Sequence, residues 1–219
     1  GNPETYGNGT PADQTLFGQH DTHWIPDGYR DGGKIMVYNN GLGYAPQLSR
    51  VQIIEPPIDA NGKYFYQSNS IYLPNAAFWS YTTPNFSDFV SGVQRLNNGN
   101  TLICDGPLGS IIELDSSDNI VWEYISPAGA NGNIITQGNP IANNTLFRAT
   151  KYAPEYEAFD GKDLTPTIPI ELNPTVSVCQ VYFPVYFLNF VAKTKEFQSF
   201  DDLFFIDVTN HNFRKGVLF

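Results

Sequence analysis

The chain has 219 residues, of which 41% are hydrophobic and 15% aromatic, enough for a core in one or two domains. Lys and Arg number 12 against 22 Asp and Glu, and the net charge of -10 argues against nucleic-acid backbones and anionic membranes as partners. The two cysteines, Cys104 and Cys179, make neither a disulfide framework nor a zinc site, although they could pair with each other. The sequence contains no glycine-rich nucleotide loop and no calcium-loop spacing, so we expect no cofactor and no metal.

Residues 1–17 contain turn residues throughout and no hydrophobic period, so we expect a loop there. The stretch from 18 to 41 is predicted to form two short strands, residues 20–25 and 34–38, around the turn Pro26-Asp27-Gly28. Two of the three histidines, His20 and His23, fall in the first of these strands. Histidine suits a nucleophile or proton carrier near neutral pH, which makes this stretch a candidate site.

The middle of the chain repeats with a regular spacing. Trp79 and Trp122 stand in similar stretches 43 residues apart, and Leu102 and Leu146 are 44 residues apart. Repeats of roughly 40–50 residues with several strands each are typical of β-propeller blades. β-Branched and aromatic residues dominate these runs, whereas helical periodicity is scarce between residues 18 and 165. The sequence therefore predicts an all-β, propeller-like repeat of four-stranded antiparallel blades, present in this chain as a partial propeller.

We expect blades at about residues 18–84, 88–127 and 132–165, within a partial propeller spanning residues 1–174. The second blade is complete, with strands predicted at residues 90–96, 101–104, 110–114 and 120–125. The first blade adds a third strand at residues 50–55 and then an insertion at 56–75 before the strand of Trp79. The third blade is partial and includes residues 145–150.

Residues 175–219 form an aromatic-rich tail of a different character. Within it, residues 176–192 are about as long as the shortest membrane spans, which need ~17–25 apolar residues. Gln180, Pro184 and Asn189 interrupt the run, so we expect no membrane span. We predict instead that residues 176–191 are buried against the sheets or against another chain.

Three stretches carry distinctive motifs: Gln-His-Asp at 19–21 followed by Gly-Lys-Ile-Met-Val-Tyr-Asn-Asn-Gly at 33–41, the run at 89–104, and Phe-Arg-Ala-Thr-Lys-Tyr-Ala-Pro at 147–154. Together they resemble the bacterial aryl-sulfate sulfotransferases, and the resemblance extends over about residues 1–174. Enzymes of this family are six-bladed β-propellers. They transfer a sulfuryl group between phenols through a sulfated histidine, without a nucleotide sulfate donor.

The resemblance implies that this protein transfers a sulfuryl group from a phenolic sulfate ester to a phenol, with His20 as the nucleophile by motif position. It also implies a periplasmic or extracellular location. Guanidinium groups suit oxyanions, which makes Arg95 and Arg148 candidate sulfate-binding residues, and His23 is a further candidate for substrate binding. Each candidate has a structural alternative, namely a hydrogen-bonded strand histidine or a surface or inter-blade salt bridge.

Side chains alternate along a strand, so His20 and Thr22 are expected to share one face of the sheet. Asp21 and His23 are then expected on the other face. An arginine together with a second histidine or an asparagine, converging on His20 within hydrogen-bonding reach, would favour the enzyme over a binding module.

Six blades of ~40–50 residues need roughly 240–300 residues, more than this chain supplies. We therefore expect upstream blades that this sequence lacks, or self-association that closes the ring. The alternative function is a non-catalytic propeller-type binding or scaffold module, secreted or surface-associated, that keeps the architecture without the chemistry.

Overall fold

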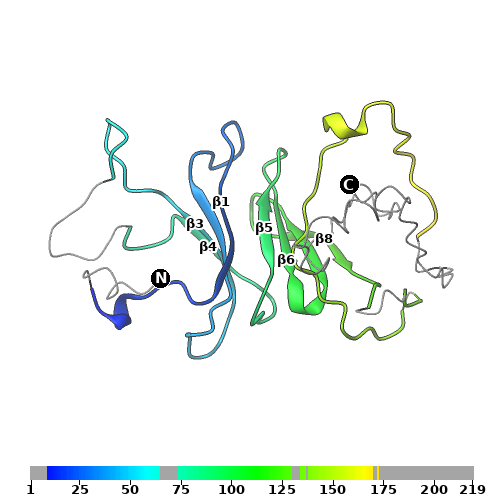
Figure 1. The fold of residues 1–219 in the computed structure, drawn as a ribbon, viewed down its shortest axis with the longest axis horizontal. Coiled ribbons are helices and arrows are strands. Elements are labelled where there is room, and N and C mark those ends of the chain that lie inside the picture. Colours follow the sequence, from blue (N-terminus) through cyan, green and yellow to red (C-terminus); the bar gives the residue numbers. More distant parts are fainter. Residues whose placement is uncertain (1–8, 65–73, 130–133, 137, 170–171, 173–219) are drawn as a thin grey trace, which may run out of the picture.

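The computed structural model describes residues 9–64, 74–129, 134–136, 138–169 and 172. These residues form two four-stranded antiparallel sheets that lie side by side (Figure 1). The helical elements in this part of the chain are short 3-10 turns, named η2 (Pro11–Asp13), η3 (Gly106–Leu108) and η4 (Glu157–Phe159). The predicted all-β fold with four-stranded antiparallel units is confirmed.

Each sheet follows the order of the chain, so that every strand is hydrogen-bonded to the next. The first sheet consists of β1 (Gln19–Trp24), β2 (Ile35–Asn39), β3 (Arg50–Ile54) and β4 (Trp79–Thr82). The second sheet consists of β5 (Gly92–Arg95), β6 (Thr101–Asp105), β7 (Ser110–Leu114) and β8 (Ile120–Ile125). These strands begin and end within two residues of the predicted ranges, because short polar turns separate the apolar runs.

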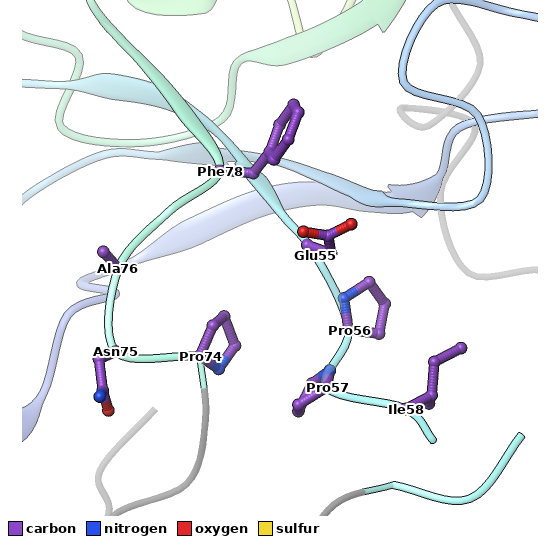
Figure 2. Close-up of a pocket in the computed structure, with 8 residues that line it drawn as sticks. All are labelled: Glu55, Pro56, Pro57, Ile58, Pro74, Asn75, Ala76 and Phe78. Carbon is purple, nitrogen blue, oxygen red and sulfur yellow. The ribbon is translucent and has the colours of Figure 1, made fainter. Parts of the chain in front are cut away.

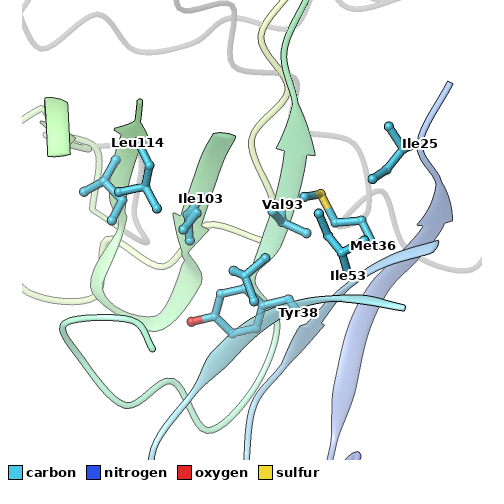
Figure 3. Close-up of a cluster of buried hydrophobic side chains, with 9 residues drawn as sticks. Ile25, Met36, Tyr38, Ile53, Val93, Ile103 and Leu114 are labelled. Atoms are coloured by element: carbon cyan, nitrogen blue, oxygen red, sulfur yellow. The ribbon is translucent and has the colours of Figure 1, made fainter. Parts of the chain in front are cut away.

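The main hydrophobic core lies in the seam between the two sheets (Figure 3). Period-two alternation directs every second side chain of each strand toward this seam. The buried side chains that meet there are Ile25, just after β1, Met36, Tyr38, Val51 and Ile53 from the first sheet, and Val93, Ile103, Ile112 and Leu114 from the second. Burying one such side chain contributes about 1.5–3 kcal/mol, so the seam is the main stabilising contact between the sheets.

The two repeat tryptophans occupy equivalent positions on the fourth strands, β4 and β8, as predicted. Each stacks on the tyrosine two residues later, with ring centroids 6.3 Å apart for Trp79 and 6.0 Å apart for Trp122. A cation from the following part of the chain covers each indole. The Arg95 guanidinium lies 5.0 Å from the Trp79 ring, and the Lys151 ammonium lies 6.0 Å from the Trp122 ring.

Residues 146–151 cover the outer face of the second sheet and bury the apolar residues Leu146 and Ala149 against it. The backbone N–H of Lys151 donates to Gln94 Oε1 at 2.8 Å, and Gln94 Nε2 donates back to the Lys151 carbonyl at 3.0 Å. The Lys151 ammonium also pairs with Glu113 at 2.6 Å. This segment therefore lies where the first strand of a third blade would lie.

The described residues after β8 form no strand, and their one sheet-like pairing is a single bridge between Ala128 and Ile134. A third blade at residues 132–165 therefore stays a prediction. Residues 175–219, with the run at 176–192 and Cys179, lie outside the described residues. Within the described part of the chain, no helix has the length and apolar character needed to cross a membrane.

The outer face of the first sheet is covered by the segment before β1. The Asn39 side chain is fully buried there and accepts the Phe17 N–H at 2.9 Å through Oδ1. Its Nδ2 donates to the Thr15 carbonyl and to Gln52 Oε1. One amide at the end of β2 thus connects this segment to two strands of the first sheet.

Asp31→Asn is expected to destabilise the fold by about 3 kcal/mol, because it leaves a buried guanidinium unpaired. The Arg95 side chain is 1% exposed, and its Nη2 lies 2.5 Å from Asp31 Oδ2. Burial lowers the pKa of Arg95, and Asp31 is the main group that opposes this effect. Asp31 has φ +61, which asparagine tolerates, so the backbone should keep its shape.

Urea unfolding measures this loss, with Asp27→Asn in the same loop as the matched control, because Asp27 is exposed. Equal unfolding free energies for the two variants would contradict the role assigned to the Arg95–Asp31 pair.

Cys104 is expected to be unreactive in the native protein. It is a buried free thiol, and burial, with Asp105 and Asp21 nearby, raises the pKa of the thiol to about 12. Because the thiolate is the reactive form, a Cys179→Ser variant should show no labelling by a disulfide reagent at pH 8 and rapid labelling in urea. Native labelling at the unfolded rate would contradict the burial of Cys104 between the second sheet and residues 146–151.

Candidate functional site

A β-bulge in β1 determines how the two histidines are presented. His20 is paired with Tyr38 and His23 with Met36, so three steps along β1 match two steps along β2. The extra residue lies between the histidines, and Asp21 there has φ +51. Residues paired across a ladder project to the same face of a sheet, so both histidines lie on the face of Met36 and Tyr38.

This finding corrects the expectation from strict alternation. His23 shares the face of His20, and Asp21 also turns toward the seam, where its Oδ2 accepts the Val93 N–H at 2.9 Å. The physical reason is the inserted residue, which shifts the period-two pattern by one position. The bulge therefore brings His20, Asp21 and His23 to the seam between the sheets.

The His20 ring is half-buried and held by its Nδ1 atom. This atom lies 2.7 Å from Asn40 Oδ1 and 3.1 Å from the Gly18 carbonyl oxygen. Both partners are acceptors, so Nδ1 carries the proton and donates it. The neutral ring then has a bare Nε2, and no described residue forms a hydrogen bond with that atom.

The orientation of the Asn40 amide is fixed by its other contacts. Asn40 is fully buried, and its Nδ2 donates to the Ser87 carbonyl at 2.9 Å and the Val90 carbonyl at 3.2 Å. The nitrogen must therefore face residues 87–90, and Oδ1 must face His20. Asn40 thus fixes the tautomer of His20 and connects it to the start of β5.

Arg148 reaches the same seam from the segment that covers the second sheet. Its Nη1 lies 3.5 Å from Asp21 Oδ1, and its side chain remains 53% exposed. His23 Nδ1 lies 2.7 Å from the Asp21 carbonyl oxygen. Next to Arg148, the Phe147 carbonyl accepts the Ser91 N–H at 3.1 Å, one residue from the Val90 carbonyl that Asn40 contacts.

His23 and Arg148 therefore meet at Asp21, and His20 lies on the same face of the first sheet with Asn40 within hydrogen-bonding reach. Among the described residues Arg148 contacts Asp21 and not His20, so of the expected convergence on His20 the asparagine is present and the arginine is not. Arg95 is placed elsewhere, in the buried pair with Asp31 and against the Trp79 ring. This is the inter-blade salt bridge that the sequence left open as its alternative, and we leave Arg95 out of the site. The sequence analysis missed Asn40 and the side chain of Asp21, although Asn40 lies inside the motif that carries the family resemblance.

A second polar group is buried in the seam below this site. Ser87 Oγ donates to Asp105 Oδ1, while Asp105 Oδ2 and the Tyr38 hydroxyl are buried with no hydrogen-bond partner among the described residues. Burial raises the pKa of Asp105, and hydrogen bonds from Ser87 and Asn85 offset part of this effect. Burial likewise raises the pKa of Tyr38.

The described residues contain no group of three or more His, Cys, Asp and Glu that could hold a metal ion. One open cavity of about 490 Å³ lies at the other end of the first sheet, beyond β3 (Figure 2). It is lined mainly by apolar residues at the two ends of the insertion and next to them: Glu55, Pro56, Pro57, Ile58, Pro74, Asn75, Ala76 and Phe78. Its lining includes neither histidine and no arginine, so it is not part of the site at the seam.

Comparisons of this chain with protein-family models, with curated proteins and with solved structures found no match.

Asp105→Asn is expected to stabilise the protein at neutral pH. The raised pKa of Asp105 means that the folded state binds the proton more tightly than the unfolded state. Its contribution to stability is therefore complete below the ordinary value of 3.8 and is lost as the pH rises through the folded-state pKa. Asparagine resembles the protonated side chain, so its advantage should disappear in acid.

Unfolding free energies of the two proteins across the pH range test this expectation, with Asp88→Asn as an exposed control. A constant difference between Asp105→Asn and the unsubstituted protein at all pH values would contradict it.

Proposed function

We propose that this protein is an aryl-sulfate sulfotransferase-like enzyme that moves a sulfuryl group from a phenolic sulfate ester to a phenol through a sulfated His20. The observation that carries the proposal is the hydrogen bond from His20 Nδ1 to Asn40 Oδ1 at 2.7 Å. It leaves Nε2 with its lone pair on a half-buried ring, as a histidine nucleophile requires. The family resemblance around His20 gives independent support.

In the first half-reaction, His20 Nε2 attacks the sulfur of the aryl sulfate. The N–S bond forms as the bond from sulfur to the phenolic oxygen breaks, and the phenolate leaves with that electron pair. The ring gains positive charge as sulfur is transferred, and the Asn40 carbonyl oxygen at Nδ1 stabilises this charge. Asn40 acts as a fixed acceptor because its own amide nitrogen is held by two backbone carbonyls.

In the second half-reaction, a phenol attacks the sulfur of sulfated His20. The O–S bond forms, the N–S bond breaks, and the electron pair returns to Nε2. The acceptor phenol gives its proton to solvent water and attacks as the phenolate, so the product is the aryl sulfate monoanion and His20 returns to its neutral form. The order is ping-pong, since the first phenol must leave before the second enters.

Arg148 binds the sulfonate oxygens in this proposal. Its guanidinium is half-exposed and, among the described residues, is held near the seam by one ion pair, with Asp21, so its remaining N–H groups can bind an oxyanion. His23 lies on the same face of the first sheet and is the second candidate for contact with the substrate.

The test is incubation of the protein with 4-nitrophenyl sulfate without an acceptor, followed by mass spectrometry under alkaline conditions that preserve N-sulfated histidine. The proposal predicts one sulfuryl group on His20 and release of one equivalent of 4-nitrophenolate. His20→Ala should lower transfer by at least about a thousandfold, because it removes the nucleophile. His23→Ala should still become sulfated at His20, since its own Nδ1 contacts Asp21 and not His20.

Label on another residue, or transfer that survives His20→Ala, would overturn the proposal. A protein that binds aryl sulfate without releasing phenolate would be the binding module that the sequence left as the alternative.

A further inference from the structure

The carboxylate of Asp21 holds a fixed position in the seam. Its backbone lies at the β1 bulge with φ +51, and its Oδ2 accepts the Val93 N–H of β5 at 2.9 Å. Gly92 leaves room for it, because a Cβ at Gly92 would lie 2.7 Å from Asp21 Oδ2 and 3.0 Å from Arg148 Cβ. The glycine is required here by the close approach of these two side chains.

The remaining oxygen of Asp21 faces Arg148. Its Oδ1 lies 3.5 Å from Arg148 Nη1, and the Asp21 side chain is 16% exposed while that of Arg148 is 53% exposed. Within the described residues this is the one carboxylate that pairs with Arg148. A negative charge is thus built in beside the cation that an oxyanion would use.

We propose that Asp21 determines the charge class of the oxyanion accepted at Arg148, favouring monoanionic sulfate esters over dianionic phosphate esters. The inference rests on the proposed function for the location of the oxyanion at Arg148. A phosphate monoester carries close to two charges above its second pKa of about 6, whereas a sulfate monoester carries one.

The physical basis is the dependence of the Coulomb energy on ligand charge. The repulsion between Asp21 and a ligand is proportional to the charge of the ligand, so a dianion is repelled twice as strongly as a monoanion at the same place. Removing the Asp21 charge should therefore change the logarithm of the affinity about twice as much for the dianion. A substitution that only disturbed the shape or packing of the site would not be expected to give this twofold ratio between the two ligands.

The experiment measures binding of methyl sulfate and methyl phosphate to the full chain at pH 8 by isothermal calorimetry. Asp21→Asn is the variant, because the amide oxygen can still accept the Val93 N–H. We expect roughly three- to tenfold tighter binding of methyl sulfate and roughly ten- to hundredfold tighter binding of methyl phosphate. Arg148→Gln should weaken both ligands, the dianion more.

Glu55→Gln is the matched control, because it changes the net charge equally at the far end of the first sheet, where Glu55 pairs with Lys34 at 3.6 Å. Thermal unfolding checks that each variant folds, and Asp21→Gly, which tolerates φ +51, replaces Asp21→Asn if the latter does not. Equal effects of Asp21→Asn on the two ligands, or effects equal to those of Glu55→Gln, would overturn the inference.

The two proposals fail separately. If Asp21→Asn changes the logarithm of the affinity twice as much for methyl phosphate as for methyl sulfate, but His20 is never sulfated, the role of Asp21 stands and the transferase proposal is wrong. If His20 is sulfated but neither Arg148→Gln nor Asp21→Asn changes ligand binding, only the inference about ligand charge is wrong.

Discussion

The structure depends on the packing of one four-stranded sheet against the next. Each sheet presents an apolar face to the seam, so neither sheet can bury these side chains alone. The first sheet gives one face to the seam and the other to the segment before β1, while the second sheet gives its outer face to residues 146–151. The same arrangement recurs at both interfaces, where a cation from the following segment covers the tryptophan of the preceding sheet.

The candidate site follows from how this packing is interrupted. In β1 the bulge at Asp21 interrupts the regular pairing with β2. The Asp21 side chain instead contacts β5 and Arg148 across the seam. Asn40 makes the second polar contact between the sheets. Its side chain, just after β2, donates hydrogen bonds to the carbonyls of Ser87 and Val90. His20 lies between these two polar contacts, so its ring is oriented by the same interactions that join the sheets.

The sequence predicted the regular features well. The spacing of Trp79 and Trp122 identified equivalent strands, because a repeated blade must place the same residue type at the same place in its core. Prediction from the sequence failed where one residue departs from the period-two alternation of a strand. Period-two alternation put His20 and His23 on opposite faces, and no local pattern marks the inserted residue that the β1–β2 register shows. Arg95 and Arg148 have the same chemistry in sequence, and only the fold separates a buried inter-blade pair from a half-exposed guanidinium.

Asn40 fixes the tautomer of the neutral His20 ring, with the proton on Nδ1 and a bare Nε2, and the proposed chemistry depends on this. Long-range proton–nitrogen correlation spectra of the protein labelled with ¹⁵N in histidine report the tautomer of each ring directly. At a pH where the ring is neutral, the account predicts a protonated Nδ1 and an unprotonated Nε2 for His20, identified by the loss of its signals in His20→Ala. A protonated Nε2 in the neutral ring of His20 would contradict it, because that nitrogen would then have no lone pair for attack on sulfur.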